Sequence, residues 1–294
     1  MRGMEMPESG GLTPLVDCHA HVYPPELARK ALGFREQRKI LEGESRYDGD
    51  TALDGTPEGY VAWLEREGFA FGVVLPLAMK PHQVHKLNDF TERVTKRFPR
   101  LLPFGAIHPD LDDLKATLED LKARGFLGVK IHPFFQKGAT MSPFFEPSWL
   151  RLFEACRDLG LVVLTCTVFH DEIVQKSTRA ANDLARLPKV FSGLKIIAAH
   201  LGAIYNWGAI HEELLGSDVY LDLSYALGFL SDEEVLEIIL KHGNEKVLFG
   251  TDTPYGSAER NLERFLRLPI SSQERANIGG LNTLTLLGKQ EGLR

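Results

Sequence analysis

The stretch Val16-Asp17-Cys18-His19-Ala20-His21 places two histidines one residue apart at the end of a short apolar run. In an extended strand alternate side chains leave from the same face, so His19 and His21 are predicted to point the same way, together with Asp17. Two neutral imidazoles that converge from the end of one strand supply half of the ligands of a zinc-type site. If this pair binds a metal ion, the rest of the chain must supply the missing ligands.

Short apolar runs alternate with amphipathic helical stretches along the rest of the chain. Strands are predicted at residues 15–19, 69–75, 102–107, 128–132, 161–167, 195–200, 219–223 and 246–251. Helices are predicted at residues 57–67, 83–97, 111–124, 148–159, 172–187, 206–215, 232–242, 257–268 and 273–287. Some of these helices begin with capping chemistry, such as the proline that follows Thr56 and the Ser-Asp-Glu-Glu sequence that begins at Ser231.

Eight strands, each followed by a helix, predict a (β/α)8 TIM barrel, with a doubly wound open sheet as the alternative. The placement of polar residues distinguishes the two folds, because several of these residues fall at the carboxyl ends of strands from the whole chain. A barrel brings such ends together on one face, whereas an open sheet spreads them along an edge. These residues are His19, His21, His108, His132, His200 and Asp252.

The predicted domain organisation is a flexible N-terminal tail over residues 1–14, followed by a single barrel over residues 15–294. Residues 22–56 form an unusually long connection after the first strand, with a helical stretch at 26–34. A connection of this length in a compact domain is usually functional or mobile. It is expected to be a lid or a subunit contact on the catalytic face, or else a simple surface excursion.

Composition excludes several classes of function. A net charge of -6 and the lack of a basic run with interleaved aromatic residues argue against a nucleic-acid partner. The three cysteines, Cys18, Cys156 and Cys166, are too few for a disulfide framework, which favours a reducing compartment. No apolar run suggests a membrane span or a signal peptide. We expect a cytoplasmic protein that acts on a small molecule, with a homodimer as one option.

Four further motifs follow the first one in a characteristic order: GVKIHP at 128–133, AHLG at 199–202, LFGTDTP at 248–254 and IGGLN at 278–282. Together with residues 16–21 they resemble the amidohydrolase superfamily. More narrowly, they are similar to the amidohydrolase-2 group, which includes aminocarboxymuconate-semialdehyde decarboxylase and related hydrolases and hydratases. The resemblance covers roughly residues 15–288.

The resemblance implies a (β/α)8 barrel that holds one divalent metal ion, zinc or alternatively manganese. Its ligands would be His19, His21, a histidine of the fifth strand and Asp252 of the eighth strand. His200, at the end of the sixth strand, would activate or orient the metal-bound water. The alternative for His200 is a packed core histidine.

Asp252 follows an apolar strand, where a carboxylate is costly unless it is paired or binds a cation. There it could both hold the metal ion and accept a proton from the attacking water. The alternative is a helix N-cap ahead of Thr253 and Pro254.

Lys130 lies two residues before His132, so both could point into the barrel. In binuclear relatives a fourth-strand lysine is carbamylated and bridges two metal ions. We favour contact with substrate or with a buried carboxylate, and an ordinary ion pair is the alternative. His132 and His108, each followed by proline, are candidate substrate contacts at the rim.

The fifth strand departs from the family pattern Gly-Leu-x-Val-Leu-x-His-Thr-Gly. This chain reads GLVVLTCTV at residues 160–168, so Cys166 stands where the ligand histidine is expected and His170 follows four residues later. Cys166 could bind the metal ion as a thiolate, at about 2.3 Å for zinc. His170 could replace it through a bend, although four residues of strand would overshoot by roughly 13 Å. Otherwise the ligand is lost and the site is weak or vacant.

The sequence thus predicts a metal-dependent hydrolase in which activated water attacks an amide, ester or lactone carbonyl. Asp252 and His200 are the predicted catalytic residues. The same ligand set also serves non-oxidative decarboxylation of unsaturated or aromatic acids, which is the first alternative. A degenerate barrel that binds without turnover is the second, and a lactonase that works without metal is a further option.

Overall fold

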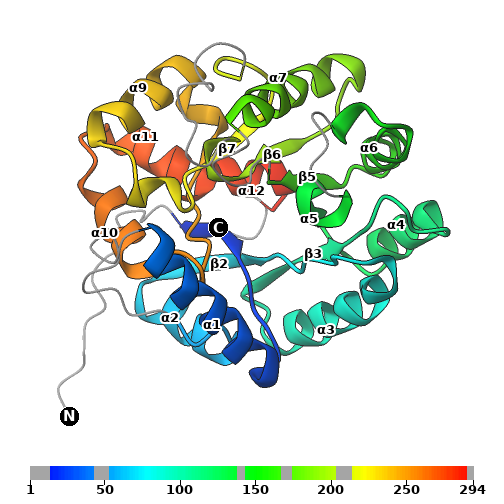
Figure 1. Ribbon diagram of the computed structural model, residues 1–294. Helices are drawn as coiled ribbons and strands as arrows, with labels where there is room; N and C mark the ends of the chain where they lie inside the picture. The colour runs from blue at the N-terminus through cyan, green and yellow to red at the C-terminus, as the bar shows by residue number, and fades with distance from the viewer. Residues whose placement is uncertain (1–13, 43–52, 138–142, 167–173, 203–213, 290–294) are drawn as a thin grey trace.

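Eight parallel strands form a closed barrel in the computed structural model, which describes residues 14–42, 53–137, 143–166, 174–202 and 214–289 (Figure 1). Each strand pairs with the next one in sequence. Backbone hydrogen bonds from Cys18 to Phe249 (3.0 Å) and from Asp252 to His19 (2.8 Å) join the segment directly after β8 to β1 and so close the barrel. The predicted (β/α)8 barrel is therefore confirmed. The strands are β1 Leu15–Ala20, β2 Phe69–Val74, β3 Leu101–Ala106, β4 Gly128–Ile131, β5 Val162–Thr165, β6 Ile196–Ala198, β7 Tyr220–Asp222 and β8 Val247–Leu248.

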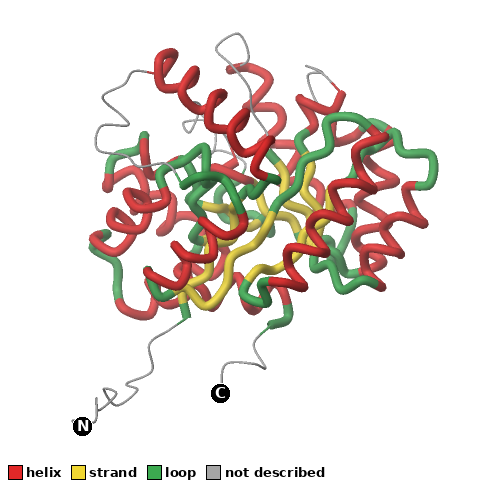
Figure 2. The backbone as a smooth tube through the Cα atoms, turned by 90° about the horizontal axis from the view of Figure 1, so that it is seen from below, coloured by secondary structure: helices red, strands yellow, loops and turns green. Residues whose placement is uncertain are grey.

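Helices surround the strands on the outside of the barrel, as the side view in Figure 2 shows. None of the described helices is both long enough and apolar enough to cross a membrane. Their bounds are α1 Pro25–Glu42, α2 Pro57–Arg66, α3 Val84–Arg97, α4 Leu114–Ala123, α5 Pro133–Lys137, α6 Pro147–Leu159, α7 Val174–Val190, α9 Asp232–His242, α10 Ala258–Arg267, α11 Ser272–Ala276 and α12 Asn282–Leu287.

Strand alternation divides the core into two apolar clusters. On β5, Val162 and Leu164 belong with Cys166 to one cluster, which also holds residues of β2, β3, β6 and β8, whereas Val163 belongs to the larger cluster that includes the helices. The smaller cluster is the barrel interior. Cys166 therefore lies on the inward-facing side of β5.

Most strands are shorter than predicted. Backbone pairing with the neighbouring strands ends where the polar residues that follow each apolar run begin. The sixth strand ends at Ala198, and His200 already adopts left-handed backbone angles (φ 56°). The predicted helix at 26–34 extends to Glu42 as α1. The prediction at 206–215 falls mostly outside the described residues, and so do the predicted tail, apart from Pro14, and residues 43–52 of the long connection.

The predicted helix at 273–287 is interrupted by a π-helical turn, Asn277–Leu281, which separates α11 from α12. A Cβ atom on Gly280 would lie 1.8 Å from the carbonyl oxygen of Pro14. Glycine therefore lets this turn approach the start of β1 closely, which brings the last helices onto the base of the barrel.

Candidate active site

Three donor atoms converge at the carboxyl-terminal end of the barrel strands. The Nε2 atoms of His19 and His21 each lie 3.3 Å from Oδ1 of Asp252. All three residues are buried, and their donor atoms lie within 4.8 Å of one another. The structure thus brings the predicted histidine pair of β1 together with the predicted aspartate that follows β8.

The tautomers of both histidines follow from the partners of their other ring nitrogen. His21 Nδ1 lies 2.7 Å from the carbonyl oxygen of Leu75, which can only accept, so Nδ1 carries the proton. His19 Nδ1 donates in the same way to a carboxylate oxygen of Asp222, at 2.9 Å. In the neutral rings both Nε2 lone pairs then face the Asp252 carboxylate with no proton between them. Such a set of acceptors fits a cation.

Asp17 does not join these donor atoms, contrary to the simple alternation expected for β1. Its carboxylate accepts hydrogen bonds from Thr251 (N at 3.0 Å, Oγ1 at 2.7 Å) and from the Tyr60 hydroxyl at 2.9 Å. The register of β1 against β2 is irregular between Asp17 and Ala20, so alternation fails there. Asp17 instead ties β1 to α2 and to the segment after β8.

Asp222 and Ser224 hold the histidines in place, although neither was predicted from the sequence. Asp222 accepts from His19 Nδ1 and, at 2.9 Å, from the backbone N–H of His200. Ser224 Oγ lies 3.1 Å from His19 Nδ1 and 2.9 Å from His200 Nδ1. One signal was available: Asp222 is a carboxylate within the apolar run of the seventh strand, where burial requires a partner.

His200 stacks on His19, with ring centroids 5.0 Å apart. Its Nδ1 donates to the carbonyl oxygen of Ser224 at 3.1 Å, which leaves Nε2 facing the site. Burial alone would lower the pKa of His200, but the negative charges of Asp252 and Cys166 raise this pKa to about 9. Burial would raise the pKa of Asp252, yet the neighbouring charge of His200 is the main cause that holds this pKa far below its ordinary value. The two groups predicted to be catalytic therefore carry opposite charge.

Cys166 lies beside Lys130 and His200 rather than in the group of three donor atoms. Lys130 Nζ is 3.1 Å from Cys166 Sγ and 3.3 Å from His19 Nε2, and the lysine is only 1% exposed. Cys166 Sγ lies 3.7 Å from His200 Nε2. Burial would raise the pKa of the Cys166 thiol, but Lys130 and His132 hold it well below its ordinary value. The other candidate for the fifth-strand ligand, His170, lies outside the described residues.

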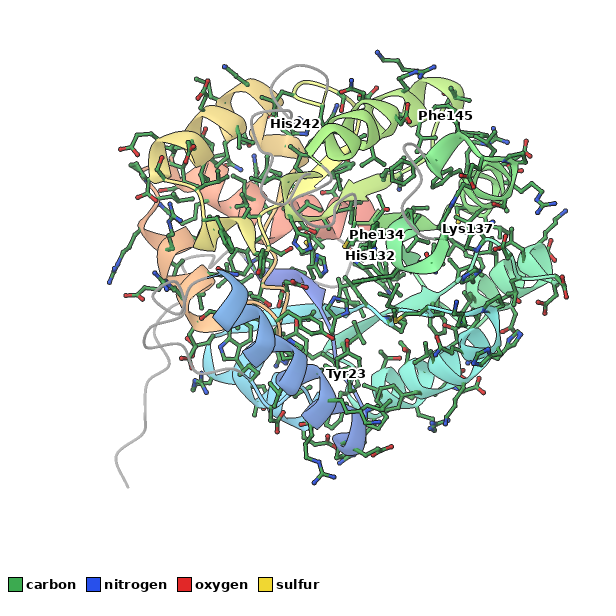
Figure 3. The ribbon with its side chains drawn as sticks, viewed as in Figure 1. Tyr23, His132, Phe134, Lys137, Phe145 and His242 are labelled. Carbon is green, nitrogen blue, oxygen red and sulfur yellow. The ribbon has the colours of Figure 1, made fainter. Side chains whose placement is uncertain are left out.

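His132 and His108 lie on the α5 side of the barrel mouth. Figure 3 shows His132 beside Phe134, and the centroid of the His132 ring lies 4.2 Å from that of Phe135. Burial lowers the pKa of His132 and of His108. His108 Nε2 lies 3.3 Å from the carbonyl oxygen of Gln136, so it contacts α5 and not the donor atoms. Substrate contact by either histidine stays a prediction.

Strained backbone is concentrated at this site. Among the described residues other than glycine, positive φ angles occur at His200 (56°), Leu201 (59°), Tyr225 (63°) and Asp252 (59°). All four follow β6, β7 or β8. Left-handed angles cost about 1–2 kcal/mol per residue, and such strain gathers where function requires a fixed geometry.

Comparison with known proteins supports the same assignment as the motifs. A family model described as Amidohydrolase matches residues 16–289, so the resemblance of the motifs is confirmed. A comparison with curated protein sequences gave no match.

Solved structures with the same fold include decarboxylases and a hydrolase. A dihydroxybenzoic acid decarboxylase from Polaromonas sp. JS666, with bound manganese and 2-nitroresorcinol, is 17% identical with a TM-score of 0.70, over 94% of this chain and 97% of that chain. A 5-carboxyvanillate decarboxylase from Sphingomonas paucimobilis is 16% identical with a TM-score of 0.70, over 94% and 99%. A probable 2-pyrone-4,6-dicarboxylic acid hydrolase from Acinetobacter baumannii is 15% identical with a TM-score of 0.66, over 93% and 99%. At these identities the likeness shows the fold.

Proposed function

The chain belongs to the amidohydrolase family of metal-dependent enzymes, and on that premise we propose that it is a metal-dependent hydrolase of a small carbonyl compound. The proposal is based on the convergence of three atoms of buried residues, His19 Nε2, His21 Nε2 and Asp252 Oδ1. None of these three atoms carries a proton. These three residues would hold the ion. When bound there, a divalent ion would polarise the substrate carbonyl and lower the pKa of a water molecule toward neutrality.

The proposed proton transfers use Asp252 and His200. Asp252 is an ionised carboxylate at the mouth of the barrel and accepts a proton from the attacking water. His200 presents Nε2 to the same space and donates a proton to the leaving group. Its ring is held for this by the Ser224 carbonyl and the backbone bond to Asp222. Opposite protonation states at two neighbouring groups are typical of an acid and base pair.

Zinc is the proposed metal, because two imidazole nitrogens and one carboxylate are ligands that zinc accepts, and manganese is the alternative. The described cysteines are free, which supports a reducing compartment such as the cytoplasm.

The test combines metal analysis with a substrate panel. Purified protein is expected to contain about one divalent ion per chain, to gain thermal stability with added Zn²⁺ or Mn²⁺, and to hydrolyse members of an ester, lactone and amide panel. Asp252→Asn should lose both metal and activity, whereas Asp112→Asn, an exposed aspartate, should lose neither. Protein without metal, without a thermal shift and without hydrolysis would contradict the proposal.

Decarboxylation of an aromatic acid is the second candidate, favoured by the aromatic side chains around the mouth. Tyr255 lies edge-on to His21, and Tyr225 lies edge-on to His200, at centroid distances of 5.5 and 5.8 Å. With Phe134 and Phe135 on the α5 side, they would suit a flat ring. Release of CO₂ from a panel of aromatic acids, without hydrolysis of the carbonyl panel, would favour this candidate over the first.

A further inference from the structure

Lys130 makes an unusual contact with the candidate metal centre. Its Nζ lies 3.3 Å from Nε2 of His19, which is one of the three donor atoms. An amino group donates hydrogen bonds and offers no acceptor while it is charged. Lys130 therefore uses the same lone pair that a metal ion would need.

That lone pair cannot serve both partners. The proton of the His19 ring is committed to Asp222 through Nδ1, so Nε2 has a single lone pair to offer. It can accept a hydrogen bond from Lys130 or bind a metal ion. In addition, the positive charge of the lysine would lie a few ångströms from a divalent ion, and burial weakens the screening of such a repulsion.

The second partner of Lys130 is the thiol that replaces the expected fifth-strand ligand. Cys166 Sγ lies 3.1 Å from Lys130 Nζ, close enough for a hydrogen bond. In the described part of the chain, the groups of donor atoms compact enough for one ion contain His19, His21 and Asp252, or His19, His200 and Asp222, and not Cys166. The position of the lost histidine is thus occupied by a lysine–cysteine pair.

We propose that Lys130 is an internal cation that competes with the divalent ion for His19 Nε2, and that its pairing with Cys166 keeps the thiol out of the ligand set. The inference rests on the metal centre of the proposed function. On metal binding, Lys130 gives up its contact with His19 and keeps the one with Cys166. Lys130 is a positioning residue in this scheme, and it sets how tightly the centre holds its ion.

The test is metal affinity, measured by calorimetric titration of metal-free protein with Zn²⁺ and with Mn²⁺. Lys130→Met removes the charge and the donor and keeps a side chain of similar length. We expect its dissociation constant for metal to fall at least about tenfold, because a like charge close to the ion is removed. Lys122→Met, at an exposed position on α4, is the matched control and should leave the affinity unchanged.

Four outcomes separate the inference from the proposed function. If Lys130→Met binds the metal ion more tightly than the wild-type protein does, the inference is supported. If Lys130→Met binds the ion equally or more weakly, the inference is overturned and the metal-dependent function stands. Metal binding only by Lys130→Met supports the inference and overturns the metal-dependent function. No binding by either protein overturns both.

Cobalt substitution tests the role of Cys166 and needs no variant. A thiolate ligand gives Co²⁺ a strong near-ultraviolet charge-transfer absorption, which imidazole and carboxylate ligands do not give. The Co²⁺ form of the unchanged protein is expected to lack this absorption. Its presence would show Cys166 bound to the ion and would overturn the inference, even if Lys130→Met failed to fold.

Discussion

At the scale of single residues, Asp222 contacts several groups of the candidate site at once. It accepts from His19 Nδ1 and from the backbone N–H groups of His200 and Ser224, at 2.9, 2.9 and 3.1 Å. These contacts fix the His19 tautomer and the place of the His200 ring. Partners of this kind control a metal centre although they do not touch the ion.

Asp222→Asn should therefore weaken metal binding by about 10–100-fold without removing a ligand. The asparagine side chain has one acceptor oxygen, so it cannot accept hydrogen bonds with both terminal atoms as the carboxylate does. The measurement is calorimetric metal titration. Asp112→Asn serves as the control, since Asp112 is exposed and belongs to neither group of donor atoms at the candidate site. Unchanged affinity in Asp222→Asn would show that the His19 tautomer is held by other contacts.

Cys166 should react differently from the other two cysteines. Burial raises the pKa of Cys18 and of Cys156, whereas Lys130 and His132 overcome burial and hold the pKa of Cys166 well below its ordinary value. Only the thiolate is nucleophilic. Iodoacetamide is therefore expected to modify Cys166 first, at a rate that changes little between pH 7 and 9.

The rate at which iodoacetamide modifies each cysteine is measured by peptide mass mapping at successive times. Denatured protein is the control, in which all three cysteines are expected to react alike. Equal rates for the three cysteines in the folded protein would contradict the prediction. So would a rate at Cys166 that rises tenfold per pH unit, as for an ordinary thiol.

At the scale of elements, the π-helical turn between α11 and α12 offers a sharp test of close packing. Gly280→Ala would place a methyl group against the Pro14 carbonyl, where the clearance is 1.8 Å. We expect a loss of about 1–3 kcal/mol in the free energy of unfolding, measured by urea denaturation. Gly228→Ala is the matched control, because nothing lies within 4 Å of a Cβ atom there. Equal stability of the two variants would mean that the turn moves freely away from β1.

Elements also show what could be predicted from the sequence and what could not. The strands were recognisable because buried apolar runs in a barrel are bounded by polar ends, and these ends supplied His19, His21, His200 and Asp252. The partners of Asp222 and of Lys130 were not predictable, since they depend on which strands become neighbours across the barrel. The orientation of Asp17 was predicted wrongly because an irregular register on β1 breaks the alternation.

At the scale of the whole molecule, stability is expected to fall in mild acid, in part through His242. This residue ends α9, on the outer ring in Figure 3, and its Nε2 donates to the Val219 carbonyl at 2.9 Å. Burial lowers the pKa of His242. In mild acid, His242 therefore binds a proton more readily in the unfolded chain than in the folded protein. The stability contributed by neutral His242 is present above about pH 6.5 and is lost as the pH falls below it.

Urea denaturation at pH 7.5 and 5.5 tests this contribution. The unchanged protein should lose more stability over that interval than His242→Gln, whose side chain does not titrate. His82→Gln, at an exposed histidine, should behave like the unchanged protein. An equal loss in His242→Gln would assign the acid sensitivity to other groups.

The junction between β1 and β8 has a consequence for how the protein is made. His19 and His21 are synthesised long before Asp252 and the backbone groups after β8 that bond to β1. Until β8 and Asp252 emerge, the nascent chain carries the two histidines without the aspartate that lies beside them in the folded protein. The proposed three-residue metal site is therefore complete only after translation of β8, and under that proposal metal capture would report completion of the barrel during biosynthesis.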